Sequence, residues 1–213
     1  MAYDLQEQEQ LDELKAWWGK YGNLILTVAT VVLLGFAAHN GWRWYQRNQA
    51  EEAAGVYAEL ERAIAAREAE RIGTLSATLT DKYGRTAYGP MAALQAARWG
   101  AESGDAAGAR TRLQWVVEHA EHPEIVAIAR VRLAGVLLDE KNYDEALKVL
   151  DSANATVHAT AILDRRGDIL FAQNKIDEAR SAYRDALAKA DAQHPLRQII
   201  QLKLDALPPT ATS

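Results

Sequence analysis

His119 and His122 are the first side chains in this sequence whose types and spacing could carry out chemistry. They lie three positions apart, so two imidazoles on one helix face could bind a metal ion. No third ligand stands at a useful spacing, and Pro123 is expected to end the helix at this point. We therefore predict a solvated turn at these histidines and no metal site.

The second candidate is a charged cluster formed by Asp164, Arg165, Arg166 and Asp168. Paired carboxylates can act as general acid and general base. Because arginines are interleaved with them, an ion-paired or solvated helix face is the better interpretation. The sequence has no glycine-rich phosphate loop, no G-x-S-x-G motif and no cysteine. We predict that the protein is not an enzyme and binds no cofactor.

Composition narrows the class of protein further. The net charge is −5 and the basic residues are scattered, whereas nucleic-acid binding needs a clustered basic face. Nucleic acid is therefore not an expected partner. Alanine is abundant, and runs of β-branched residues are scarce outside residues 24–34. Because alanine is the best helix former, these features predict an all-α protein.

Residues 24–38 form an uncharged segment of fifteen residues, and this segment is the clearest structural signal in the sequence. Alone it is short for a bilayer span, which needs about 20 residues. Aromatic side chains flank it: Trp17, Trp18 and Tyr21 precede it, and Trp42, Trp44 and Tyr45 follow it. Such rings prefer the headgroup level, and from Trp18 to Trp42 a helix rises roughly 36 Å. We predict a single transmembrane helix at residues 21–42, with these six aromatics as membrane-interface anchors in the lipid bilayer.

Other interpretations of this segment fit less well. A buried core helix would not need aromatic clusters at both ends. A cleavable signal peptide would explain the small residues Gly35 and Ala37, but signal peptides begin with a basic region and this N-terminus is acidic. Charge does not decide the orientation, because Lys15 and Lys20 on one side balance Arg43 and Arg47 on the other.

The remainder of the chain contains an internal repeat. Asp144-Glu145-Ala146 and Asp177-Glu178-Ala179 are 33 residues apart, one short of the tetratricopeptide period of about 34. The same offset relates Leu133-Ala134 to Arg166-Gly167, Leu137 to Leu170, and Leu150 to Tyr183. We expect Ala134 and Gly167 to lie where two antiparallel helices cross closely, since a larger side chain would push them apart.

A weaker third copy lies upstream, where Ala97, Gly104-Asp105 and Ala109 occupy the same places. Residues 43–84 are expected to add a preceding helix pair, and Leu196–Leu207 a closing helix. We predict an N-terminal segment at 1–20, the transmembrane helix at 21–42, a tetratricopeptide-like (TPR-like) α-solenoid of antiparallel helix pairs at 43–207, and a disordered tail at 208–213.

In such a solenoid the first helix of each pair lines the inner, concave face, where partners bind. The repeat register places five residues on that face: Val131, Leu138, Asp164, Asp168 and Phe171. They are our predicted partner-binding residues, although some could instead pack on neighbouring repeats.

Several stretches together resemble a known family. They are the acidic N-terminus and short span, Gly41–Tyr45, Val131–Ala134, Ala146–Asp151, Asp164–Leu170 running into Ala179–Tyr183, and Gln201–Leu207. Over nearly the whole chain this order is similar to the ancillary subunits of the bacterial SecYEG translocon, which carry a TPR-like domain. The Pro-Pro-Thr tail and the weak first repeat depart from that family's pattern.

The resemblance implies a single-pass protein of the bacterial inner membrane, with a short cytoplasmic N-terminus and the repeats in the periplasm. It implies association with Sec channel subunits and with a membrane-anchored periplasmic chaperone of the prolyl-isomerase type. The function would be that of an adaptor that helps translocated envelope proteins reach chaperones. The alternative hypothesis is a membrane-tethered regulatory scaffold that sequesters a signalling protein.

Overall fold

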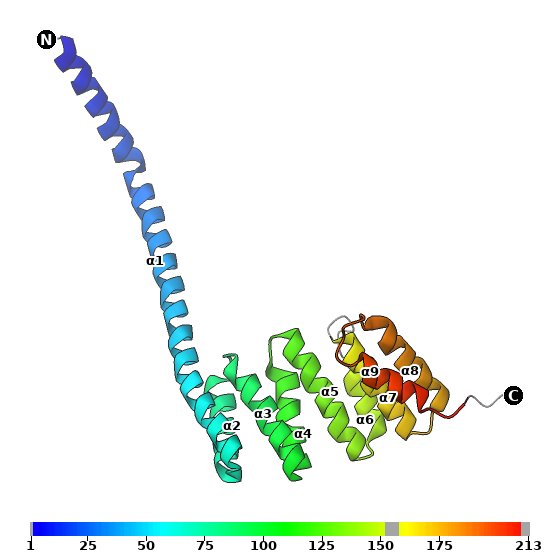
Figure 1. The fold of residues 1–213 in the computed structure, drawn as a ribbon. Helices are drawn as coiled ribbons and strands as arrows, with labels where there is room; N and C mark the ends of the chain where they lie inside the picture. Colours follow the sequence, from blue (N-terminus) through cyan, green and yellow to red (C-terminus); the bar gives the residue numbers. More distant parts are fainter. Residues whose placement is uncertain (1, 152–157, 210–213) are drawn as a thin grey trace. The chain divides into compact units, whose positions relative to one another are not determined.

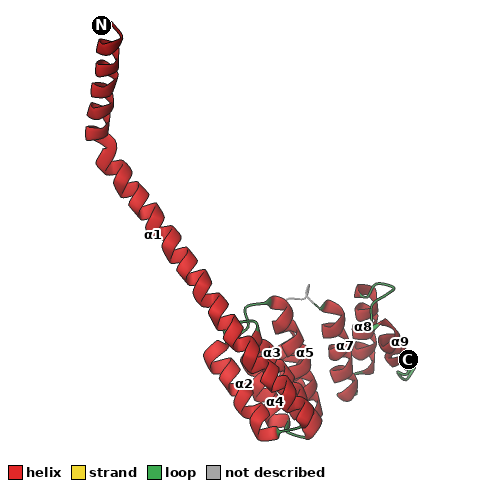
Figure 2. Cartoon of the chain, turned by 60° about the vertical axis from the view of Figure 1, so that its left-hand side comes forward, coloured by secondary structure: helices red, strands yellow, loops and turns green. Residues whose placement is uncertain are grey.

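The computed structural model describes residues 2–151 and 158–209, and within these ranges the chain forms nine helices and no strand (Figures 1 and 2). The all-α prediction is confirmed. The expected break at 152–154 lies outside the described residues, as does most of the expected tail. The chain divides into two compact units, residues 1–49 and residues 50–213, and helix α1 (Ala2–Ala66) contributes to both.

The first unit is helical throughout its described residues. In the part of the chain that the structure describes, α1 is the one helix long and apolar enough to cross a membrane. Its apolar side chains are uncovered: Leu33 and Phe36 are 67% and 65% exposed. The hydroxyls of Thr27 and Thr30 donate to the carbonyls of Asn23 and Leu26, both at 2.7 Å. This stretch therefore presents no unsatisfied hydroxyl to an apolar surrounding.

The second unit is a series of antiparallel helix pairs closed by one more helix. The pairs are residues 50–66 of α1 with α2 (Ala69–Tyr83), α3 (Tyr88–Ser103) with α4 (Ala106–His119), α5 (Pro123–Asp139) with α6 (Tyr143–Asp151), and α7 (Ala159–Ala172) with α8 (Ile176–Lys189). Helix α9 (Arg197–Asp205) packs on α8 and closes the series. The predicted helix pairs and closing helix are therefore present.

The turn after each first helix has the same backbone geometry. The residues with positive φ in these four turns are Arg67, Gly104, Lys141 and Asn174. In each turn the following N–H donates to the carbonyl five positions back, as from Asn142 to Leu137 at 2.8 Å and from Lys175 to Leu170 at 2.9 Å. This left-handed C-cap ends a helix while it satisfies a terminal carbonyl. Its recurrence places four helix pairs in one common register.

The small residues lie where the helices of a pair meet, as predicted. Ala134, Ala146 and Ala179 are fully buried. A Cβ on Gly167 would lie 2.6 Å from Cδ1 of the Tyr183 ring and closer still to Cε1. Only a hydrogen therefore fits at residue 167.

The expectation about Pro123 was wrong. Helix α4 ends at His119, and Pro123 is the first residue of α5 rather than the end of a helix. A proline at the first helical position lacks only an N–H that would have no partner inside the helix, and its fixed φ suits the helix start. The turn between α4 and α5 thus separates the two histidines.

Asp105 caps α4, and we predict a measurable cost for its loss. Its Oδ1 accepts a hydrogen bond from the Gly108 N–H at 2.9 Å. Asp105→Ala should lower the free energy of unfolding by about 1 kcal/mol in urea titrations, as loss of an N-cap typically does. Asp105→Asn keeps an acceptor and should cost less; equal losses for both variants would contradict the capping role.

Candidate partner-binding face

The first helices of successive pairs lie side by side, because α5 contacts both α3 and α7. Figure 2 shows α3 and α5 as neighbours. These three helices form one face of the second unit. We call it the inner face, because in solenoids of this kind the first helices line the concave side on which partners bind.

A hollow of about 420 Å³ opens on this face, which we call the inner hollow. Its lining comes from α3, α4, α5 and α7: Ala97, Arg98, Ala101, Glu102, Leu113, Arg132, Gly135, Val136, Asp139 and Arg165. The space arises from two small residues. The positive-φ turn residues align α3, α5 and α7. In this alignment Ala101 of α3 is equivalent to Leu138 of α5 and Phe171 of α7. Gly135 of α5 is equivalent to Arg98 of α3 and Asp168 of α7.

Three arginines surround the inner hollow, and their partners differ. Arg98 pairs with Glu102 at 2.8 Å on its own helix, and Arg165 pairs with Asp168 at 3.3 Å. Arg132 donates to the Leu94 carbonyl at 3.4 Å, and no carboxylate is paired with it among the described residues. Partial burial lowers the pKa of Arg132, and repulsion from Arg98 lowers it further.

The predicted acidic pair is tied to the closing helix. Lys203 of α9 lies 2.8 Å from Asp164 Oδ1 and 2.7 Å from Asp168 Oδ1. The Tyr183 hydroxyl donates to Asp168 Oδ1 at 2.8 Å. Desolvation raises the pKa of Asp164 in spite of Lys203, and it raises the pKa of Tyr183, as does the charge of Asp168. These contacts join α7, α8 and α9, so the cluster fastens the C-terminal end of the second unit.

We predict that Asp164→Asn changes how stability depends on pH. Because the pKa of Asp164 is raised above 3.8 on folding, the folded state binds this proton more readily than the unfolded state. Its contribution to stability therefore falls as the pH rises from 3.8 through the folded pKa. Thermal unfolding should show Asp164→Asn gaining on the wild type as the pH rises from about 4 to 7.

Asp105→Asn is the matched control at lower pH. The wild type should gain stability relative to this variant as the pH rises to about 4 and then change little, a change opposite in sign to that of Asp164→Asn. The Gly108 N–H and then Arg112 lower the pKa of Asp105, so its contribution is present above pH 3.8 and lost as the pH falls through the lowered pKa. The same sign for both variants would contradict these environments.

The five predicted partner-binding residues occupy different surroundings. Val131 and Leu138 are partly buried against the core. Asp164 and Asp168 are engaged by Lys203. Phe171 is 48% exposed and remains accessible. None of the five lines the inner hollow, and their role in binding stays a prediction.

Sequence reasoning missed Arg132. A signal for it existed, because Arg132 and Arg165 are 33 residues apart, the offset of the Asp-Glu-Ala repeat. Arg165 itself was recognised only as part of a charged cluster. Arg98 lies at a different position of the repeat, so no spacing relates it to the other two.

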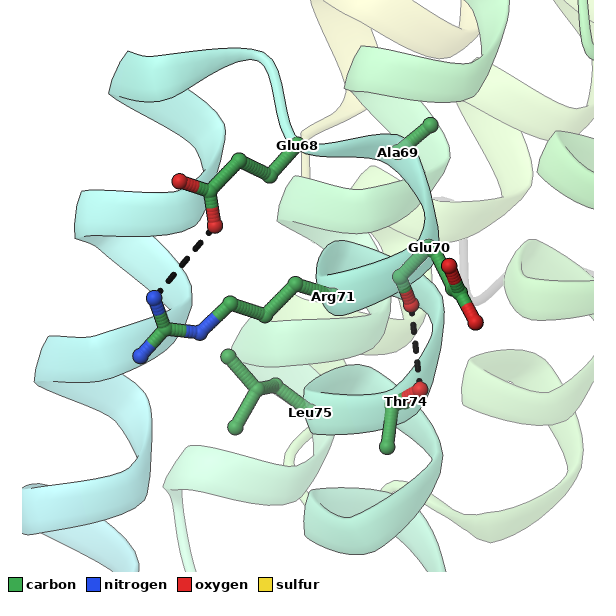
Figure 3. A pocket seen from close by; sticks show the side chains of 6 residues that line it. All are labelled: Glu68, Ala69, Glu70, Arg71, Thr74 and Leu75. Carbon is green, nitrogen blue, oxygen red and sulfur yellow. Dashed lines mark hydrogen bonds and ion pairs between the residues drawn. The ribbon is translucent and has the colours of Figure 1, made fainter.

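Another hollow lies at the turn between α1 and α2 (Figure 3). The Arg71 guanidinium reaches across it to Glu68 at 3.3 Å and to Glu59 at 3.5 Å. The Thr74 hydroxyl donates to the Glu70 carbonyl at 3.0 Å. Arg71 and Thr74 of this hollow therefore already have bonding partners, whereas Arg132 of the inner hollow has no carboxylate partner among the described residues.

Of the two candidate histidines, His119 makes local side-chain contacts, and His122 lies in the turn just before α5. The His119 ring stacks on Trp115, with ring centroids 4.9 Å apart, and its Nδ1 lies 2.9 Å from the Trp115 carbonyl oxygen. Across the described residues, no three His, Asp or Glu side chains gather closely enough to hold a metal ion.

The predicted membrane-interface anchors lie on α1 in the first unit. All six are exposed, and they form ring contacts within each group: Trp17 with Trp18 and Tyr21, and Trp42 with Tyr45. Two aromatic groups therefore stand on the helix on either side of its uncovered apolar stretch. Their depth in a membrane stays a prediction.

Comparison with known proteins agrees with this architecture. The family model of the tetratricopeptide repeat-like domain matches residues 15–209. The ancillary SecYEG translocon subunit of Neisseria gonorrhoeae is 31% identical over 97% of this chain and 100% of its own length. Those of Escherichia coli and Haemophilus influenzae are 26% and 25% identical over 94% and 85% of this chain, and over 96% and 92% of their own lengths. A chain that shares this repeat architecture and nearly its full length with them belongs to the family of ancillary SecYEG translocon subunits.

Proposed function

We propose that this protein is a non-enzymatic, membrane-anchored adaptor at the Sec translocon. The observation that carries the proposal is the full-length similarity to proteins named as ancillary SecYEG translocon subunits. The structure supports it with a repeat unit of helix pairs, an architecture that binds other proteins, and with one helix apolar enough to cross a bilayer.

In this proposal residues 21–42 cross the bacterial inner membrane, residues 1–20 lie in the cytoplasm, and the repeats lie in the periplasm. The six exposed aromatics of α1 would sit at the two headgroup regions. The repeats would contact Sec channel subunits and a membrane-anchored periplasmic chaperone of the prolyl-isomerase type. Translocated envelope proteins would pass from the channel to that chaperone.

Purification from membranes in mild detergent tests the association. Affinity capture of the full chain should recover Sec channel subunits and a periplasmic chaperone. The matched control is a single-pass protein of the same membrane that carries the same tag. Recovery of neither partner above this control would refute the proposal.

A reporter fused after Ser213 tests the orientation. Alkaline phosphatase folds productively in the periplasm, so the fusion should be active. An inactive phosphatase fusion, paired with a fluorescent fusion that is bright only in the cytosol, would instead favour a scaffold that sequesters a cytosolic signalling protein.

A further inference from the structure

The inner hollow has features of a site for an acidic ligand. Arg98 and Arg132 both line the inner hollow, and after burial the charge of Arg98 further lowers the pKa of Arg132. Among the described residues, no carboxylate is paired with Arg132 to offset this charge. A carboxylate placed between the two guanidiniums would relieve the repulsion and accept charge-assisted hydrogen bonds.

The third arginine extends the positive charge along the face. Arg132 of α5 reaches back to the Leu94 carbonyl of α3. Arg165, its equivalent one pair later, reaches back to α5, where a Cβ on Gly135 would lie 3.4 Å from its Cζ. Neighbouring helix axes are about 8–10 Å apart, so three first helices cover roughly 16–20 Å. An extended chain covers that distance with about five or six residues.

The floor and the edge define the shape of the ligand. Ala97, Ala101 and Gly135 leave room for a backbone to approach closely. Glu102, which pairs with Arg98, and Asp139 lie about one and two turns further along their helices than Arg98 and Arg132, and they add negative charge to the lining. A single line of acidic side chains across the arginines fits this arrangement, whereas a broad polyanion would meet the two carboxylates.

We propose that the inner hollow binds an extended segment of a partner protein through acidic side chains that contact Arg98, Arg132 and Arg165. This deepens the proposed function and rests on it in one respect, that partners bind the inner face. The segment would run across α3, α5 and α7, with acidic residues alternating with small ones.

Binding of synthetic peptides to the full chain in mild detergent tests the proposal. The probe is a fluorescent eight-residue peptide of alternating glutamate and alanine, with both ends blocked so that only side chains carry charge. Glutamine and lysine versions are the neutral and basic controls. Fluorescence anisotropy should show binding of the glutamate peptide alone, and added salt should weaken it.

Two triple variants separate the inner hollow from overall charge. The first triple variant combines Arg98→Gln, Arg132→Gln and Arg165→Gln, and it should weaken binding of the glutamate peptide by roughly tenfold or more. The second triple variant combines Arg62→Gln, Arg85→Gln and Arg184→Gln, which remove the same charge from exposed positions that do not line the hollow. Its binding of the glutamate peptide should stay within about threefold of the wild type. Arg132→Gln alone, with its fold checked by circular dichroism, serves if the first triple variant unfolds.

The proposal is overturned if the glutamate peptide does not bind, if the glutamine or lysine peptide binds as tightly, or if both triple variants weaken binding equally. These assays contain no translocon. Failure here would leave association with Sec channel subunits intact, and failure to recover Sec subunits would leave peptide binding intact.

Discussion

Replacing Gly167 by alanine should lower the free energy of unfolding by about 2–3 kcal/mol, near the upper end for overpacking a core. The added Cβ would lie 2.6 Å from Cδ1 of the buried Tyr183 ring. The side chain cannot swing away about χ1 without breaking the hydrogen bond that its hydroxyl donates to Asp168 Oδ1 at 2.8 Å. Urea unfolding of the full chain in mild detergent, followed by circular dichroism, measures the effect.

The preceding helix pair supplies a matched rescue. At the equivalent positions it has Ala134 and Leu150, both buried in one core cluster. The double variant Gly167→Ala with Tyr183→Leu copies that pair, so it should be more stable than the sum of the two single losses predicts, by about 1 kcal/mol or more. Purely additive losses, or a Gly167→Ala variant as stable as the wild type, would contradict the packing described for this pair.

Replacing Lys203 by methionine should lower the free energy of unfolding by about 2 kcal/mol, because hydrogen bonds to charged groups contribute about 1.5–3 kcal/mol each. The ammonium is the cation that Asp164 and Asp168 share, and its side chain is 28% exposed. Without it, two partly buried carboxylates one helical turn apart would repel each other.

Lys189→Met is the control, since Lys189 is an exposed lysine at the end of α8. Its replacement should change stability by no more than about 0.5 kcal/mol. Thermal and urea unfolding of both variants give the comparison. Equal effects would mean that Lys203 does not fasten α9 to the repeats.

The repeat was predictable from the sequence because packing constrains the small residues. A residue at the point where two helices cross must be small, and Ala146 and Ala179 are such residues. This requirement recurs once in every repeat. The turns gave a weaker signal. A positive φ favours glycine, and of the four turns only the one at Gly104 has it. The first pair was therefore expected only in outline, and its register became clear from the backbone.

The surroundings of the inner face were less predictable, because they depend on contacts between distant segments. Lys203 is 39 residues from Asp164, and nothing in the local sequence indicates that the closing helix reaches back to α7. The inner hollow exists because Ala101 and Gly135 are small. The effect of a small residue can be judged only when the positions of the neighbouring helices are known. The sequence related Arg132 to Arg165 only by their spacing, and that spacing did not indicate that both residues line the inner hollow.

Crosslinking in intact membranes tests most directly whether this repeat unit works at the translocon. Phe171 is exposed on α7, the first helix of its pair. A photoreactive amino acid at this position should give crosslinks to Sec channel subunits or to a periplasmic chaperone. The same group at Arg184, exposed on the second helix α8, should give fewer. Crosslinks only to cytosolic proteins, or an equal yield of Sec crosslinks from both positions, would contradict an adaptor that binds its partners through the inner face.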